Sequence, residues 1–207
     1  MSDVRPGAVL WDLGGVFLDW DPRHLYRKLF GGDVAAMEQF LTEVCSPRWH
    51  AQQDCGRNVL DACSELKGEF PQHGALIDAW WERSEEMING VIDGTVPLLA
   101  EVKLGGAACY ALSNMERENW AKRLGVYPFL HWFDGYFISG LEGVMKPDDR
   151  FFWRALGRFG LGPEEVLFVD DRAANVSAAR TLGIASILFR GAGPLRDELA
   201  TRGLLEG

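Results

Sequence analysis

The sequence has few cysteines, and their number and spacing argue against a disulfide-rich protein and against a zinc site. Four cysteines stand at positions 45, 55, 63 and 109 of 207 residues, and no two form a C-x-x-C pair. That density is too low for a disulfide scaffold, and the spacing gives little support to a zinc site. We therefore expect four reduced thiols that serve packing.

Long hydrophobic runs and excess positive charge are also missing. The chain has no apolar stretch of about 18 residues, so we expect no membrane-spanning helix and no membrane partner. Its first residues lack the apolar run of a secretory signal, which favours a cytoplasmic protein. The formal net charge is −9, which argues against nucleic acid as a partner.

Five short apolar runs have the composition of buried strands. They are apolar throughout rather than alternating, which is typical of strands covered on both faces in a parallel sheet. Helix-length stretches with apolar residues three or four apart lie between them, as in 95–104, 150–159 and 172–182. This order predicts an α/β fold with a doubly wound parallel sheet. The runs are Ala8–Trp11, Ala107–Leu112, Gly135–Ile138, Val166–Val169 and Ile184–Leu188.

The segment 19–92 breaks this alternation. It shows four helical patterns, punctuated by proline and glycine, and no convincing strand. We therefore expect an all-helical insertion at 19–92 and an α/β core formed by 1–18 together with 93–207. The helical patterns cover residues 25–30, 34–44, 59–70 and 75–87.

Polar residues follow the predicted strands. Parallel strands bring their carboxyl ends to one edge of the sheet, where ligands bind. Clustered carboxylates repel one another unless a cation binds, and oxygen ligands with room for water suit Mg²⁺. Glycines let backbone amides approach an anion, and a hydroxyl and an ammonium complete a phosphate socket. A carboxylate beside that socket can attack phosphorus. These residues are Asp12, Gly14 and Gly15 after the first run, Ser113 and Asn114 after the second, Lys146 after the third, and Asp170 and Asp171 after the fourth.

In these residues the sequence resembles the haloacid dehalogenase-like (HAD) superfamily, specifically its phosphatases with a small helical cap. Four motifs occur in order between Ala8 and Phe189, and the insertion falls where the family carries its cap, a name we keep for residues 19–92. The resemblance implies a Mg²⁺-dependent phosphomonoesterase that acts on a small phosphorylated metabolite, such as a sugar phosphate or a nucleotide. The motifs are Val9–Val16, Ala111–Asn114, Lys146–Asp148 and Leu167–Asn175.

The resemblance also implies a role for each residue of the site. Asp12 is the nucleophile, and Lys146 offsets charge on the transferring phosphoryl group. The carboxylates of Asp12, Asp170 and Asp171 surround the metal with the carbonyl of Gly14. Asn175, one turn after Asp171, either orients a ligand or faces solvent. The implied phosphate-binding residues are Leu13, Gly14, Gly15, Ser113, Asn114 and Lys146.

Gly14 departs from the usual family pattern. Most phosphatases of the family carry an aspartate two residues after the nucleophile, which protonates the leaving oxygen and then activates water. Such help is worth about 10²–10⁴ in rate, so turnover is slow, another group supplies the proton, or the substrate has a good leaving group. Asp19 and Asp21 are candidates for that group, although both can simply cap the helix that starts near Pro22.

Other functions stay open from the sequence. A 2-haloacid dehalogenase also lacks the second aspartate, but it would leave Asp170 and Asp171 as idle charges. A protein that binds a phosphorylated ligand with little turnover, or a phosphomutase, would keep the same socket. The four histidines share no metal or triad spacing, so we expect each to be a surface or core residue. The substrate and the oligomeric state do not follow from the sequence.

Overall fold

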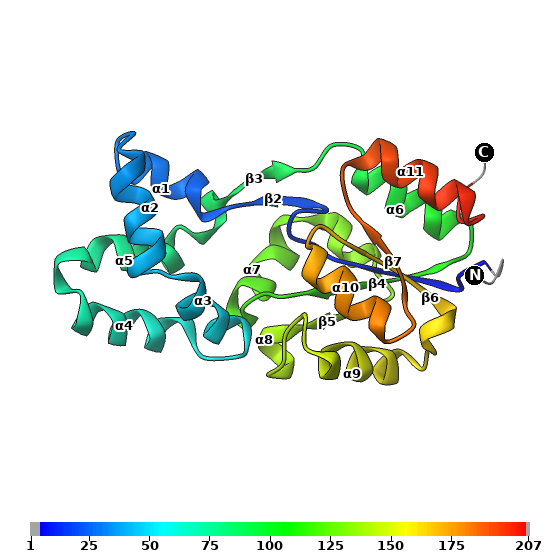
Figure 1. The fold of residues 1–207 in the computed structure, drawn as a ribbon. Coiled ribbons are helices and arrows are strands. Elements are labelled where there is room, and N and C mark those ends of the chain that lie inside the picture. Colours follow the sequence, from blue (N-terminus) through cyan, green and yellow to red (C-terminus); the bar gives the residue numbers. More distant parts are fainter. Residues whose placement is uncertain (1–4, 206–207) are drawn as a thin grey trace.

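The centre of the molecule is a parallel sheet. A computed structural model of the chain describes residues 5–205, and within them one sheet holds five strands in the order β5-β4-β1-β6-β7 (Figure 1). Every neighbouring pair runs parallel, and each strand lies within one residue of its predicted run. The strands are β1 (Ala8–Trp11), β4 (Ala108–Ser113), β5 (Gly135–Ile138), β6 (Val166–Asp170) and β7 (Ala185–Leu188).

Helices cover both faces of the sheet, as the continuous apolar strands predict. Successive side chains of a strand point to opposite faces. Val9 and Trp11 of β1 therefore lie in the core under α6 and α11, whereas Ala8 and Leu10 lie in the core under α9 and α10. The doubly wound α/β fold is confirmed. Its helices are α6 (Thr95–Leu104), α7 (Arg117–Val126), α8 (Ser139–Glu142), α9 (Asp149–Phe159), α10 (Ala173–Thr181) and α11 (Ala192–Thr201), with 3-10 turns at Pro128–Trp132 and Pro163–Glu165.

The cap packs around a hydrophobic core of its own. Tyr26 lies at its centre, with its ring centroid 5.1 Å from that of Phe40 and 6.2 Å from that of Trp80. Figure 1 shows these helices gathered at one end of the molecule, beside the sheet. The cap helices are α1 (Pro22–Leu29), α2 (Val34–Glu43), α3 (Pro47–Asp54), α4 (Val59–Glu69) and α5 (Gly74–Glu82), with 3-10 turns at Pro71–His73 and Ser84–Met87.

Two short strands correct the expectation of a segment without strands. β2 (Leu18–Trp20) and β3 (Ile88–Val91) pair antiparallel and connect the cap to the sheet (Figure 1). Each strand is three or four residues long, which is too short for a period to show in the sequence. Their pairing joins opposite ends of the cap, so no local turn marks it either.

The helix α3 is a second feature that the sequence analysis missed. Its polar sequence carries no apolar period, but its first turn has a recognisable start. The Ser46 hydroxyl accepts a hydrogen bond from the Trp49 amide at 3.2 Å, and Pro47 occupies the first helical position. Serine followed by proline is a known signature of a helix N-terminus.

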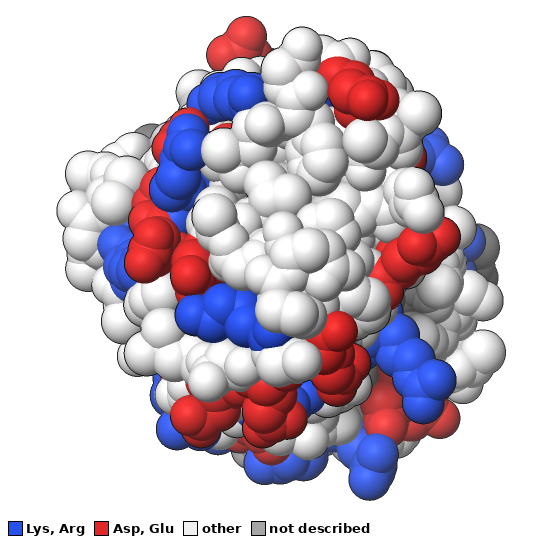
Figure 2. Space-filling view, turned by 90° about the vertical axis from the view of Figure 1, so that its left-hand side faces the viewer, with Lys and Arg blue, Asp and Glu red and all other residues white. Residues whose placement is uncertain are grey.

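The surface shows mixed charge where Figure 2 views the cap end of the molecule. Basic and acidic side chains alternate around a broad uncharged centre there, and they do not merge into one basic patch. In the described part of the chain, no helix combines the length and the hydropathy needed to cross a bilayer.

Candidate active site

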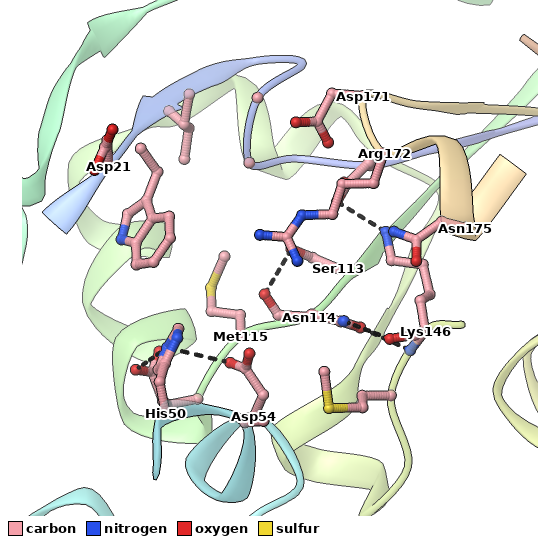
Figure 3. A pocket seen from close by; sticks show the side chains of 18 of the residues that line it. Asp21, His50, Asp54, Ser113, Asn114, Met115, Lys146, Asp171, Arg172 and Asn175 are labelled. Atoms are coloured by element: carbon pink, nitrogen blue, oxygen red, sulfur yellow. Dashed lines mark hydrogen bonds and ion pairs between the residues drawn. The ribbon is translucent and has the colours of Figure 1, made fainter. Parts of the chain in front are cut away.

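A cavity of about 340 Å³ opens where the carboxyl ends of β1, β4 and β6 face the cap. Of the predicted site residues, Asp12, Gly14, Gly15, Ser113, Asn114, Lys146, Asp171 and Asn175 line it. Figure 3 shows Asp171, Ser113, Asn114 and Lys146 on the sheet side of this space, with His50 and Asp54 of the cap across from them. The strand order explains the gathering, because β1 lies between β4 and β6 and the three loops are neighbours.

Lys146 is fully buried between two carboxylates. Its Nζ lies 2.9 Å from Asp12 Oδ1 and 2.8 Å from Asp170 Oδ2, and it also donates to the Leu112 carbonyl at 2.8 Å. Burial alone would lower the pKa of Lys146, but the negative charges of Asp12 and Asp170 outweigh it and raise the pKa above the ordinary value. The ammonium therefore stays charged and fixes both carboxylates.

The three aspartates form one cluster. Each of Asp12, Asp170 and Asp171 places a carboxylate oxygen within 4.8 Å of the others. Burial raises the pKa of Asp12 well above its usual value; Lys146 opposes this rise, and the charges of Asp170 and Asp171 add to it. Burial and Asp170 also raise the pKa of Asp171. A group of hard oxygen donors that carries more negative than positive charge fits a divalent cation such as Mg²⁺.

Asn175 and Asn114 hold the charged residues in place. The Asn175 amide donates to both carboxylate oxygens of Asp170 at 3.0 Å, so it orients a predicted ligand rather than facing solvent. Asn114 accepts from the Lys146 backbone amide and donates to the Lys146 carbonyl, both at 2.9 Å. Ser113 is buried beside it, at the end of β4. The helix that follows begins at Arg117, with Glu116 as its N-cap, so Ser113 and Asn114 do not cap it.

The two glycines after Asp12 differ in their surroundings. Gly15 has a φ of +73°, and a Cβ there would lie 2.3 Å from Asp171 Oδ2. Its amide donates to the Leu18 carbonyl at 2.8 Å, and the Leu13 amide donates to Asp12 Oδ1 at 2.7 Å. In this structure Gly15 therefore makes room for Asp171 and does not offer its amide to an anion, in contrast to our expectation. Gly14 has open space, since a Cβ would meet nothing within 4 Å.

The two acidic residues at the start of the cap have other partners. Asp19 accepts from Asn89 Nδ2 at 3.0 Å and lies 3.3 Å from a ring nitrogen of His24. The bond from Asn89 lowers the pKa of Asp19, which makes it a poor proton donor. Asp21 caps α1 by accepting from the Arg23 amide at 2.9 Å, although it also lines the cavity.

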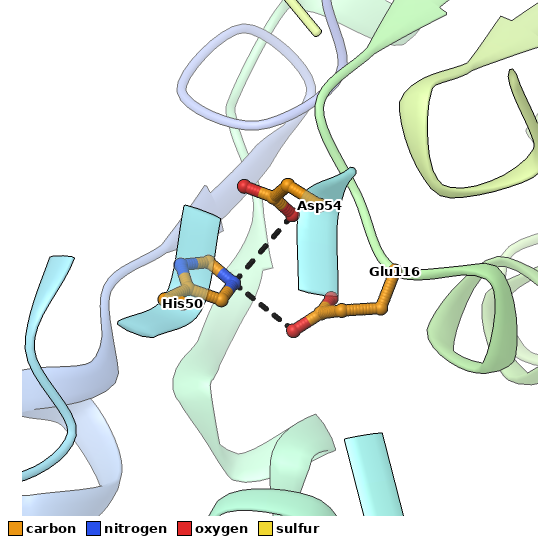
Figure 4. Close-up of side chains that lie close together, drawn as sticks. All are labelled: His50, Asp54 and Glu116. Atoms are coloured by element: carbon orange, nitrogen blue, oxygen red, sulfur yellow. Dashed lines mark hydrogen bonds and ion pairs between the residues drawn. The ribbon is translucent and has the colours of Figure 1, made fainter. Parts of the chain in front are cut away.

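The cap adds a cluster that the sequence analysis missed (Figure 4). His50 and Asp54 lie one turn apart on α3, and His50 Nε2 is 3.6 Å from Asp54 Oδ1 and 3.0 Å from Glu116 Oε1. Burial works against a charge on His50, but Asp54 and Glu116 outweigh it and raise its pKa to about 9. The i, i+4 spacing of His50 and Asp54 was visible in the sequence, but the helix that gives it meaning was not predicted.

Comparison with known proteins identifies relatives that match most of the chain. The model of the haloacid dehalogenase-like hydrolases matches residues 6–183. A sesquiterpene phosphatase of Aspergillus oryzae is 28% identical over 94% of this chain and 92% of its own length. A HAD family enzyme from Bacteroides thetaiotaomicron, solved with magnesium and inorganic phosphate, superposes with a TM-score of 0.71 at 22% identity, covering 90% of this chain and 95% of that one. A dehalogenase structure has a TM-score of 0.62 at 19% identity, over 90% and 84% of the two chains.

Proposed function

This chain belongs to the haloacid dehalogenase-like hydrolases, and on that premise we propose that it is a Mg²⁺-dependent phosphatase. Its substrate is the phosphate monoester of a small metabolite, such as a sugar phosphate or a nucleotide. One observation carries the proposal: Lys146 bridges Asp12 and Asp170 at the base of the cavity, with Asp171 beside them. A dehalogenase that displaces halide from carbon has no use for this acidic pair, whereas a metal-dependent phosphatase does.

The metal would be held by Asp12, Asp171 and the Gly14 carbonyl. Asp170 already receives Lys146, Asn175 and the Arg172 amide, which donates to Oδ1 at 2.8 Å, and its charge adds to the attraction for a cation. When bound, Mg²⁺ supplies positive charge beside the transferring phosphoryl group. Two of the comparisons support the choice of magnesium and phosphate. The Aspergillus oryzae relative is a phosphatase, and the Bacteroides thetaiotaomicron enzyme was solved with magnesium and inorganic phosphate.

Asp12 is the nucleophile in this mechanism. The Leu13 amide and Lys146 both contact its Oδ1, which leaves Oδ2 to attack phosphorus. The new bond joins Oδ2 to phosphorus as the bond to the leaving oxygen breaks, giving an aspartyl-phosphate and an alkoxide, which takes its proton from solvent water to become the alcohol. Water then hydrolyses the aspartyl-phosphate to inorganic phosphate and restores Asp12. Lys146 and Ser113 stabilise the charge on the phosphoryl oxygens.

Gly14 leaves this mechanism without a proton donor at the usual position. Asp19 and Asp21 hold other hydrogen bonds, as described above. The rate of this enzyme should therefore come nearest to that of other phosphatases of the family on substrates whose leaving oxygen needs no protonation.

Hydrolysis of p-nitrophenyl phosphate tests the proposal, because its leaving group is good. We expect release of p-nitrophenol with Mg²⁺, none with EDTA, and none from Asp12→Asn. Asp61→Asn, a matched change at an exposed position of the cap helix α4, should keep wild-type activity. No release from the wild type would overturn the proposal. Dechlorination of 2-chloropropionate without metal would assign the site to dehalogenation, and phosphate-ester binding without release would assign it to a binding protein.

A further inference from the structure

One helix of the core, α7, makes polar contacts with the cap along its length. Figure 1 shows α7 between the cap helices and the sheet. Lys122 of α7 donates to the Trp81 carbonyl at 3.1 Å, and its Nζ lies 3.1 Å from the centroid of the Trp81 ring. Asn58 of the cap donates to Glu118 of α7 at 3.0 Å. The cap is therefore fastened to α7 as well as to the ribbon of β2 and β3.

A buried chain of hydrogen bonds runs through Glu116, the residue before the first turn of α7. Glu116 Oε1 lies 3.0 Å from His50 Nε2 of α3 (Figure 4), and its Oε2 accepts from Asn119 Nδ2 at 3.0 Å. Asn119 Oδ1 in turn accepts from the Ser84 hydroxyl of the cap at 3.0 Å. Glu116, Asn119 and Ser84 are 4%, 3% and 1% exposed, so water competes little for these bonds. The chain therefore joins α3 and the 3-10 turn before β3 to one turn of α7.

Glu116 occupies the N-cap position of α7 without capping the helix. Among the described residues its side chain accepts from no backbone amide of the first turn, and glutamate is not one of the favoured N-cap residues. Burial works against a charge on Glu116, but His50 and Arg123 outweigh it and lower its pKa to about 2. The contact with the cap, rather than the start of α7, therefore explains this buried carboxylate.

The same residue stands at the end of a loop that the proposed mechanism uses. Ser113 and Asn114, two of the proposed phosphate-binding residues, open the loop after β4, and only Met115 separates Asn114 from Glu116. On the core side, the Met115 amide donates to Ser139 Oγ at 3.0 Å. The loop is thus held by α8 on one side and, through Glu116, by the cap on the other. A displacement of Glu116 reaches Ser113 through the backbone.

We propose that Glu116 is a positioning residue, which sets the place of Ser113 by holding the loop after β4 against the cap. This inference rests on the proposed phosphatase function. Ser113 would contact the phosphoryl oxygens both before and during transfer, so its displacement weakens the binding of substrate and transition state alike. Loss of such uniform binding raises KM and leaves kcat nearly unchanged. Inorganic phosphate, the product, uses the same loop and should bind more weakly as well.

Steady-state hydrolysis of p-nitrophenyl phosphate by the full-length protein with Mg²⁺ tests this role. Glu116→Ala should raise KM and the inhibition constant of inorganic phosphate by about 5- to 50-fold, with kcat within about threefold of the wild type. Glu116→Gln keeps one oxygen for His50, so it should show a smaller rise, and it serves for the comparison if Glu116→Ala does not fold. Glu69→Ala, at an exposed glutamate that ends α4, should change none of the three constants. A loss confined to kcat, or unchanged constants, would overturn the inference.

A double-mutant cycle shows whether Glu116 acts through the cap. His50→Ala should raise KM about as much as Glu116→Ala does, and the double variant should add little, because both changes remove the same contact. Rises in KM that multiply in the double variant would show that the two residues act separately, which contradicts the proposed link.

Hydrogen exchange followed by mass spectrometry gives a readout that needs no turnover. Amides of residues 111–116 should exchange at least about tenfold faster in Glu116→Ala than in the wild type, while α9 keeps its protection. Unchanged exchange at 111–116 would overturn the inference. If the wild type shows no Mg²⁺-dependent hydrolysis, the phosphatase proposal falls and this role falls with it. Variants that hydrolyse the ester with an unchanged KM overturn only the role of Glu116.

Discussion

Replacing Gly14 by aspartate tests whether the site lacks its proton donor. The structure has room for the side chain, because a Cβ on Gly14 meets no atom within 4 Å. Gly14 is also absent from the glycines with positive φ, so aspartate needs no strained backbone there. Gly15 serves as the contrasting position, because it has a φ of +73° and a Cβ there would lie 2.3 Å from Asp171 Oδ2.

The size of the effect depends on the leaving group. General acid–base catalysis contributes about 10²–10⁴ in rate when a proton must reach the leaving oxygen. The new carboxylate would join a cluster that already holds three, and their repulsion disfavours the fully ionised site. We therefore expect a gain at or below the lower bound of that range: about 10- to 100-fold in kcat/KM for an alkyl phosphate, and less than about threefold for p-nitrophenyl phosphate. Gly15→Ala should reduce both, because it displaces Asp171.

Steady-state kinetics with both esters at saturating Mg²⁺ give the result. The decisive quantity is the ratio of alkyl to aryl kcat/KM, since a general loss of folded protein cancels in it. If Gly14→Asp folds and binds Mg²⁺ but leaves that ratio unchanged, a missing acid does not limit the enzyme. Equal responses of Gly14→Asp and Gly15→Ala would refute the structural distinction between the two glycines.

Three further predictions concern stability, each measured by urea unfolding. Lys146→Met should lower the free energy of unfolding by about 3–5 kcal/mol at pH 7 without Mg²⁺, because it leaves two buried carboxylates without their cation; a loss below about 1 kcal/mol would contradict this. Gly140→Ala should cost more than about 2 kcal/mol, since its Cβ would lie 2.6 Å from the Arg117 amide nitrogen. Gly157→Ala in the last turn of α9, where a Cβ meets nothing within 4 Å, should instead add up to about 0.5–1 kcal/mol. The raised His50 pKa of about 9 means that the folded protein holds a proton there that the unfolded chain releases near pH 6.5. His50 should therefore stabilise fully below pH 6.5 and lose up to about 3 kcal/mol as pH rises through 9, a decline that His50→Asn should lack.

The sheet and the cluster of candidate residues at its edge could be predicted because their signals are local. Each strand is a largely apolar run, and most of the site residues stand at or directly after the end of a strand, whereas Lys146 comes only after β5 and α8. Asp12, Ser113 and Asp170 reach the same edge because parallel strands all end there, although their position side by side also depends on β1 lying between β4 and β6. The structure adds the contacts between these residues. Lys146 bridges Asp12 and Asp170, Asn175 donates hydrogen bonds to Asp170, and Asp171 packs on Gly15.

The cap side of the site could not be predicted, because its contacts join segments that are far apart in the sequence. His50 and Glu116 are 66 residues apart, and their hydrogen bond depends on how α3 packs against the start of α7. Neither residue belongs to a motif, and α3 has no apolar period. The ribbon of β2 and β3 likewise depends on pairing between distant, very short segments. Only the Ser46-Pro47 start and the i, i+4 pair on α3 were available as signals.

The charges of the site explain why phosphate and metal should bind together. Lys146 provides one positive charge to Asp12, Asp170 and Asp171, so the ionised cluster keeps an excess of negative charge. A phosphate dianion that approaches this cluster alone is repelled, and burial of the charges strengthens the repulsion. A divalent cation would remove the excess and return the pKa of Asp12 toward the range in which the carboxyl is ionised, as the proposed nucleophile must be. The affinity for phosphate should therefore rise with Mg²⁺, and by linkage the affinity for Mg²⁺ should rise equally with phosphate.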